Sequence, residues 1–207
     1  DQSYRIPGGP IHELSQNIIN KVQNRFDKQY KPREEQGLLK RYSDITQVDM
    51  SSGNWLVLSS ANYFLEDAKD LCEIQGWYYQ CKGINSVSLK LLLALNNWEH
   101  WRKGDLLNHL EIKNIYEYLG SSVLPGFQKG KTLHSDAKYT LKECQEQHGL
   151  VASDVWYNSF EGLDPMTETY IRNMRANGET LNKNPRIKMS TIHAAKGGEA
   201  DNVLLMQ

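Results

Sequence analysis

The last twenty residues constrain the fold most, because they place a short polar turn between two strand-like apolar runs. The first run covers Ile187 to Ile192, and the second covers Val203 to Met206. The residues with polar or charged side chains between the runs include His193, Lys196 and Glu199. In α/β proteins, Gly-containing turns at strand ends present ligand-contacting groups. The pattern therefore predicts an α/β fold with a candidate binding site at this turn.

Composition is typical of a globular protein and sets limits on its partners. The chain has 207 residues, with 39% hydrophobic and 24% charged residues, which suits one domain or one domain with an insertion. Its formal net charge is -1, so bulk charge gives no support for nucleic-acid binding, although a neutral domain can carry a local basic groove. No apolar run approaches the roughly 18 residues of a membrane span, so we expect no membrane partner.

The three cysteines bear on the cellular compartment of the protein, and the chain ends bear on whether it is part of a longer protein. Cys72, Cys81 and Cys144 lack metal-ligand spacing, and we expect reduced thiols in an intracellular protein. The six histidines show no metal-site spacing either, so no metal ligand is predicted. The chain begins without Met and stops just after a strand-like run, which predicts a fragment of a longer protein.

The first half of the chain reads as a helix followed by a βαβ unit. Apolar residues recur at helical spacing over residues 10–29, where Pro10 suits the first turn. The run 55–59 predicts a buried parallel strand, and residues 62–75 predict a helix that Gly76 ends. Residues 77–81 predict the next strand. The residues expected to face inward from the second helix are Leu65, Ala68, Leu71 and Cys72.

The middle of the chain reads as helices without intervening strands. Amphipathic patterns cover residues 86–101, 104–120 and 136–148, so residues 96–170 are expected to form a helical insertion. In the first helix the expected inward residues are Leu89, Leu92, Leu93, Leu95 and Trp98. The aromatic and basic cluster at 98–103 has two readings, base stacking or core packing, and we favour packing.

The C-terminal turn also carries a specific resemblance. Its sequence Ser-Thr-Ile-His-Ala-Ala-Lys-Gly-Gly-Glu, starting at Ser190, resembles motif V of the UvrD/Rep-type superfamily 1 DNA helicases. The matching positions are Thr191, Ile192, His193, Ala195, Lys196, Gly197, Glu199, Ala200 and Val203. The resemblance implies that Glu199 accepts a hydrogen bond from the ribose and that Gly197 lies beside the nucleotide. It implies that Thr191, His193 and Lys196 face the DNA channel, as DNA contacts, or the interface with the partner domain. Gly198 and the segment 200–202 depart from the family pattern.

Two further strings resemble motifs of the same family. Gln2-Ser3-Tyr4-Arg5 is similar to motif IV, which implies that Gln2 and Tyr4 contact the nucleotide, with the Tyr4 ring on the adenine, and that Arg5 reaches the γ-phosphate. The run ending at Asn62 resembles motif IVa, which implies that Asn62 contacts single-stranded DNA. Asn62 has a second reading as the N-cap of the helix that follows it. Ser60 stands where some relatives have a basic residue.

One segment resembles a phosphate-binding loop in part. Gly130-Lys131-Thr132 has the ending of a P-loop, but that motif needs a Gly five residues before the Gly-Lys pair, and position 125 is Pro. We interpret residues 125–132 as a polar turn. Without a P-loop or a magnesium-binding acidic box, this chain is not expected to hydrolyse ATP by itself.

Together these features predict an α/β parallel-sheet domain, and the resemblance implies that it is RecA-like, without the P-loop. The resemblance implies the second motor domain (1–95 and 171–207) of an ATP-dependent DNA helicase or translocase, interrupted by a reduced helical insertion (96–170). ATP would bind against the first RecA-like domain of the same polypeptide, which would hold most of the Mg²⁺ contacts. The other expected partner is single-stranded DNA. Two alternatives stay open: an inactive helicase-like scaffold of a repair or replication complex, and an α/β nucleotide-binding module without a DNA role.

Overall fold

A computed structural model describes residues 6–24, 31–120, 133–181, 183–196 and 198–207. The chain forms two compact units, residues 1–48 and 49–207. The expected insertion at 96–170 therefore falls within the second unit. Gln2, Tyr4, Arg5, Gly197 and the whole P-loop-like segment at 125–132 lie outside the described residues.

The first unit contains the helix α1, Pro10–Asn20, and a 3-10 turn, η1, at Ile45–Gln47. Pro10 lies in the first turn of α1, as predicted, but the helix ends nine residues before the predicted limit at residue 29. None of its residues is buried. Because tertiary packing supplies most of the stability of a helix in a protein, this unpacked helix has little to extend it beyond three turns.

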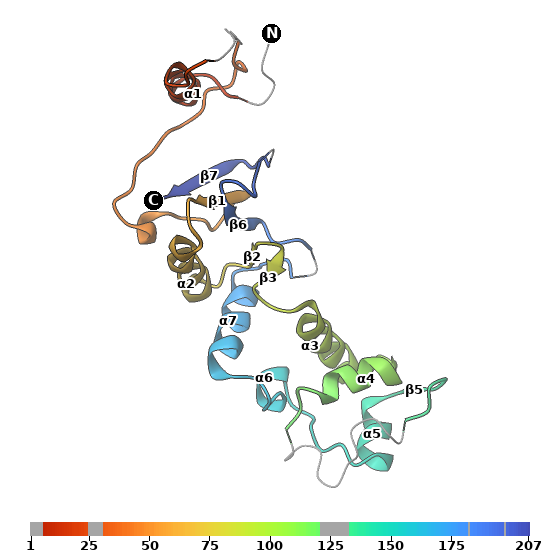
Figure 1. Cartoon of the computed structure of the whole chain (residues 1–207). Helices are drawn as coiled ribbons and strands as arrows, with labels where there is room; N and C mark the ends of the chain where they lie inside the picture. Colours follow the sequence, from red (N-terminus) through yellow and green to blue (C-terminus); the bar gives the residue numbers. More distant parts are fainter. Residues whose placement is uncertain (1–5, 25–30, 121–132, 182, 197) are drawn as a thin grey trace. The chain divides into compact units, whose positions relative to one another are not determined.

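The second unit is built on a five-stranded, mostly parallel sheet with the order β3-β2-β6-β1-β7. Its strands are β1 (Trp55–Ser59), β2 (Tyr79–Cys81), β3 (Ile84–Asn85), β6 (Ile187–Thr191) and β7 (Asn202–Met206). β1 pairs in parallel with β6 and β7, β2 pairs in parallel with β6, and β3 returns antiparallel beside β2. The predicted mixed α/β fold with parallel strands is confirmed. The carboxyl ends of the four parallel strands consequently meet at one edge of the sheet (Figure 1).

One face of the sheet is covered by helices. After β1 the chain forms a 3-10 turn, η2 (Asn62–Phe64), and then helix α2 (Leu65–Gln75), which packs against β1. The buried residues of α2 are the four predicted ones, Leu65, Ala68, Leu71 and Cys72. Burial raises the pKa of the Cys72 thiol to about 12, so Cys72 acts as a small apolar side chain at neutral pH. All three cysteines are free thiols.

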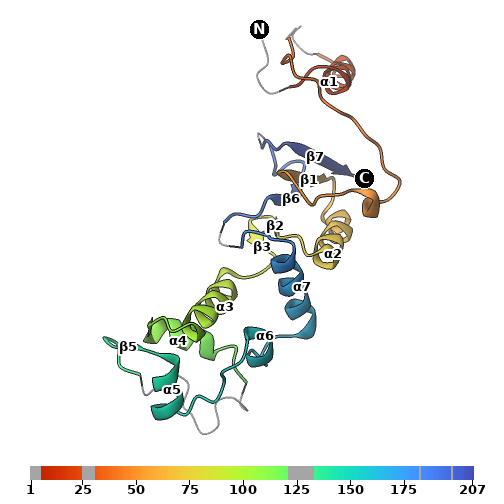
Figure 2. The ribbon, with the colours of Figure 1, turned by 180° about the vertical axis from the view of Figure 1, so that it is seen from behind.

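Gly76 ends α2 in the left-handed conformation, with φ 68°, as the sequence predicted. The end of α2 also lies against α7 (Pro165–Ala176), which packs beside it in both views of the chain (Figures 1 and 2). A Cβ added at Gly76 would lie 2.5 Å from Cβ of Asn173 in α7. Gly76 is therefore required both for its backbone conformation and for the close approach of the two helices.

Replacing Gly76 by alanine should lower the free energy of unfolding by about 2–4 kcal/mol. About 1–2 kcal/mol comes from left-handed backbone at a residue with a Cβ, and the rest from overpacking against α7. Gly178 is the matched control, because its φ is 71° but a Cβ there meets no atom within 4 Å. Urea unfolding of both variants should show the smaller loss for Gly178→Ala. Equal losses would contradict the role assigned to the Asn173 contact.

The remaining helices form the segment that connects β3 to β6. They are α3 (Leu89–Arg102), α4 (His109–Tyr116), α5 (Leu141–Gln147), α6 (Trp156–Ser159) and α7. Two short strands not predicted from the sequence, β4 (Leu107–Asn108) and β5 (Lys138–Tyr139), pair antiparallel before α4 and α5. Both helices start later than predicted because Asn108 and Thr140 form capping boxes with Glu111 and Glu143.

Two tryptophans form the centre of this helical segment. Trp98 and Trp101 of α3 are fully buried, with ring centroids 6.0 Å apart. The Nε1 atom of Trp98 donates a hydrogen bond to the carbonyl of Asp154 (3.0 Å), and that of Trp101 donates one to the carbonyl of Tyr139 (2.9 Å). This confirms the packing reading of the 98–103 cluster over the base-stacking one.

The predicted inward face of α3 is wrong at two positions. Leu89 and Leu93 are 58% and 50% exposed, whereas Leu91 and Ala94 are buried beside the tryptophans. α4 and α6 both pack against α3, and the Trp98 ring lies 6.0 Å from the ring of Phe160 at the end of α6. Because α3 has leucines around much of its circumference, its sequence alone did not identify the buried side.

Candidate functional site

The turn after β6 is fastened to the carboxyl end of β1. The amide of Ile192 donates to the carbonyl of Ser59 (3.0 Å), which extends the parallel pairing by one residue. Thr191 then closes the turn, since its carbonyl accepts from the amide of Ala195 (3.1 Å) and its Oγ1 from the amide of Ala194 (3.4 Å). The predicted strand, polar turn and strand are confirmed, and the turn is held at the same sheet edge as the loop after β1.

The start of β7 is fastened at the opposite, amino-terminal edge. Oδ2 of Asp201 accepts hydrogen bonds from the backbone amide (3.1 Å) and the side-chain amide (2.9 Å) of Asn54. The amide of Asn202 donates to the carbonyl of Asn54 (3.0 Å). Asp201 and Asn202 lie in the segment that departs from the helicase pattern, and here they fix the alignment of β7 with β1.

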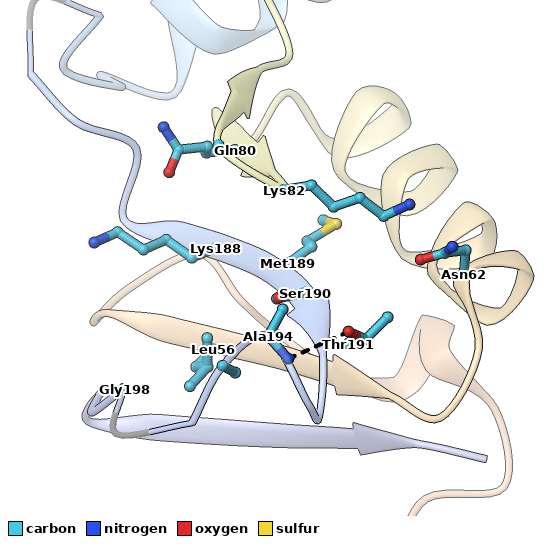
Figure 3. A pocket seen from close by; sticks show the side chains of 12 residues that line it. Leu56, Asn62, Gln80, Lys82, Lys188, Met189, Ser190, Thr191, Ala194 and Gly198 are labelled. Carbon is cyan, nitrogen blue, oxygen red and sulfur yellow. Dashed lines mark hydrogen bonds between the residues drawn. The ribbon is translucent and has the colours of Figure 1, made fainter.

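A groove of about 560 Å³ lies across β1, β2 and β6 near their carboxyl ends (Figure 3). Strand residues alternate between the two faces of a sheet. Val57, Met189 and Tyr79 have buried side chains. Lys188 and Ser190 alternate with Met189 along β6 and line the groove, where Lys188 is exposed and Ser190 is half-buried. The residues lining the groove are Leu56, Asn62, Gln80, Lys82, Gly83, Lys188, Met189, Ser190, Thr191, Ala194, Ala195 and Gly198.

The structure brings two of the predicted DNA-contacting residues to this groove. Asn62 comes from the loop after β1 and Thr191 from the end of β6, and both line it. His193 and Lys196 are exposed on the adjoining turn without lining the groove, and Glu199 is exposed on the segment leading to β7. Gln2, Tyr4, Arg5 and Gly197, expected on the nucleotide side, lie outside the described residues.

The N-cap reading of Asn62 is wrong. Asn62 is the first residue of the 3-10 turn η2, whose N-cap is Ala61, and no side chain caps it. The amide of Phe64 bonds instead to the carbonyl of Ala61 (3.3 Å). Asn62 is exposed, so its amide group is directed to solvent rather than used to start the helix.

Sequence reasoning missed two lysines of the groove. Lys188 is an exposed residue of β6, and Lys82 lies in the turn between β2 and β3. For Lys188 a signal existed, because Ile187, Lys188, Met189 and Ser190 alternate between apolar and polar as a half-covered strand does. For Lys82 no signal was available, since the β2–β3 hairpin itself was not predicted.

The groove has a cationic lining. Within the part of the chain that the structure describes, neither Lys82 nor Lys188 lies within 4.0 Å of a carboxylate, and no Asp or Glu is among the lining residues. The other polar groups are amides and hydroxyls, which bond to phosphate or to bases. This arrangement suits an anionic ligand with hydrogen-bonding capacity, on a chain whose net charge is near zero.

Comparisons of the chain with protein-family models, with curated proteins and with solved structures found no match. Among the described residues, no group of three or more His, Cys, Asp or Glu side chains could hold a metal ion. None of the described helices is long and apolar enough to cross a membrane.

Proposed function

We propose that this chain is the second RecA-like motor domain of an intracellular, ATP-dependent superfamily 1 DNA helicase or translocase, and that its groove is part of the track for single-stranded DNA. The observation that carries the proposal is the meeting of Asn62 and Thr191 in one groove. Sequence resemblance named both as DNA contacts from separate motifs. Their convergence beside two lysines without a carboxylate suits a phosphodiester backbone.

The sheet topology supports the RecA-like part of the proposal. Four of the five strands of this sheet are parallel, and the loops at their carboxyl ends carry the candidate site, as in α/β nucleotide-dependent proteins. The motor domain would comprise residues 1–95 and 171–207, with the helical insertion at 96–170. α7 begins at Pro165 and packs on α2. The proposed boundary between the insertion and the motor domain, at residues 170 and 171, therefore falls within α7.

The nucleotide side of the proposal rests on the resemblance. Gln2, Tyr4, Arg5, Gly197 and Glu199 would contact ATP, while the first motor domain would contribute the P-loop and most of the Mg²⁺ contacts. Among these residues the structure describes Glu199, whose exposed position leaves it accessible from outside this unit. An ATP cleft shared by two domains explains how a chain without a P-loop could belong to an ATP-driven motor.

The test is ATP hydrolysis by the intact protein that contains this chain, with and without single-stranded DNA. We expect strong stimulation by DNA in the intact protein and no hydrolysis by residues 1–207 alone. An intact protein that binds DNA but does not hydrolyse ATP would instead indicate an inactive scaffold. One that hydrolyses ATP without any response to DNA would indicate a nucleotide-binding module. Hydrolysis by residues 1–207 would overturn the interpretation of the 125–132 turn.

A further inference from the structure

Lys82 occupies a position that disfavours lysine. β2 and β3 are joined by the two-residue turn Lys82-Gly83, and both residues have positive φ, 50° and 82°. Two-residue hairpins with positive φ at both positions strongly prefer Asn-Gly, because asparagine tolerates the left-handed conformation better than other residues with a side chain. A lysine there is strained, and strain in a non-glycine residue points to a use for its side chain.

The side chain of Lys82 extends to the candidate DNA site. In Figure 3 it runs from the β2–β3 turn toward Asn62, while Lys188 points toward the other end of the groove. Lys82 and Asn62 together line both this groove and a neighbouring hollow beside α2. The loop that carries Asn62 offers no cation of its own, because Ser60 and Ala61 precede it.

We propose that Lys82 is the cation that holds the phosphodiester backbone of single-stranded DNA beside Asn62. The inference rests on the proposed function, and adds to it a residue that no motif of the sequence indicated. The ammonium group contributes a point charge that is independent of base sequence. The polar side chains of Asn62 and Thr191 lie at the same sheet edge and can form hydrogen bonds to the same stretch of the DNA backbone. In this arrangement a hairpin turn, rather than the loop after β1, supplies the charge.

The decisive variant is Lys82→Asn. It removes the charge while placing the preferred residue in the turn, so the hairpin should fold at least as well as in the original protein. The assay is the fluorescence anisotropy of a labelled oligo(dT) bound to residues 1–207 at several NaCl concentrations. At low salt, Lys82→Asn should weaken the affinity for oligo(dT) roughly fivefold. The slope of log affinity against log salt should become shallower by about 0.7, as expected for the loss of one phosphate contact to a single strand.

Two variants act as controls. Lys183→Asn removes the same charge from an exposed residue before β6, at the amino-terminal edge of the sheet, and should leave affinity and slope unchanged. Lys82→Arg keeps the charge and should retain binding. Equal losses in Lys82→Asn and Lys183→Asn, or no loss in Lys82→Asn, would overturn the inference while leaving the proposed function standing. Absence of oligo(dT) binding by the unmodified chain would count against both.

Discussion

Replacing Arg5 by alanine in the intact protein should lower DNA-stimulated ATP hydrolysis on the order of a thousandfold, the effect of removing an arginine that stabilises charge on a transferring phosphoryl group. ATP binding should weaken far less, because Arg5 would act mainly on the γ-phosphate in the transition state. Steady-state hydrolysis and binding of a fluorescent ATP analogue measure the two effects separately. Hydrolysis and binding that fall together would argue against the role given to Arg5.

Arg33 provides the matched control for this experiment. It is an arginine of the same unit, and it forms an ion pair with Glu35 at 3.2 Å with much of its side chain exposed. Arg33→Ala removes the same charge without touching any motif, so hydrolysis should stay within about twofold, as expected of a surface substitution. Similar losses in Arg5→Ala and Arg33→Ala would mean that the overall charge of the first unit matters, and not the position of Arg5.

Replacing Trp101 by alanine should lower the free energy of unfolding by about 3–5 kcal/mol, the usual effect of removing a fully buried large aromatic side chain. The substitution leaves a cavity beside Trp98 and removes the donor for the carbonyl of Tyr139. Urea unfolding followed by circular dichroism measures the loss without depending on tryptophan fluorescence. A loss below about 1 kcal/mol would show that Trp101 is not at the centre of the core.

Two further variants separate the contributions of this side chain. Trp101→Phe keeps most of the packing but leaves the Tyr139 carbonyl without its partner, so it should lower stability by about 1–3 kcal/mol. Leu93→Ala, in the same helix but 50% exposed, should change stability by less than about 0.5 kcal/mol. If Leu93→Ala destabilised as much as Trp101→Ala, the buried side of α3 would be wrongly assigned.

The elements with a clear local signal were predicted correctly. β1, β6 and β7 are short apolar runs bounded by polar turns, and α2 has a full inward stripe and a terminal glycine. The errors arose where the local signal was ambiguous or where distant contacts decide. Leucines on several sides of α3 left its buried face undetermined, and the short strands β4 and β5 depend on pairing with each other across a long connection.

The candidate site also contains residues that could be predicted from the sequence and residues that could not. Asn62 comes after β1 and Thr191 is the last residue of β6. The sequence identified both strands, so the presence of these residues at one sheet edge could be predicted once the strands were taken as parallel. Lys82 could not, because its place in the site depends on the hairpin that returns β3 beside β2, and its turn lacks the asparagine that usually marks such hairpins. The exposed positions of His193 and Lys196 beside the groove depend on the path of the turn after Thr191.

The position of β1 between β6 and β7 determines when this sheet can form during synthesis. Both neighbours of β1 come from the last part of the chain, and the tether between Asn54 and Asp201 joins residues 147 positions apart. At ribosomal speeds of about 5–20 residues per second, β1 waits roughly 7–30 s for its partners. The helices α3 and α4 pack on each other and lie close together in the sequence, so they can fold before β6 and β7 are made. During that interval β1 lacks both strands that flank it in the finished sheet, and of the elements that pack against it only those made before β6, such as α2, are available.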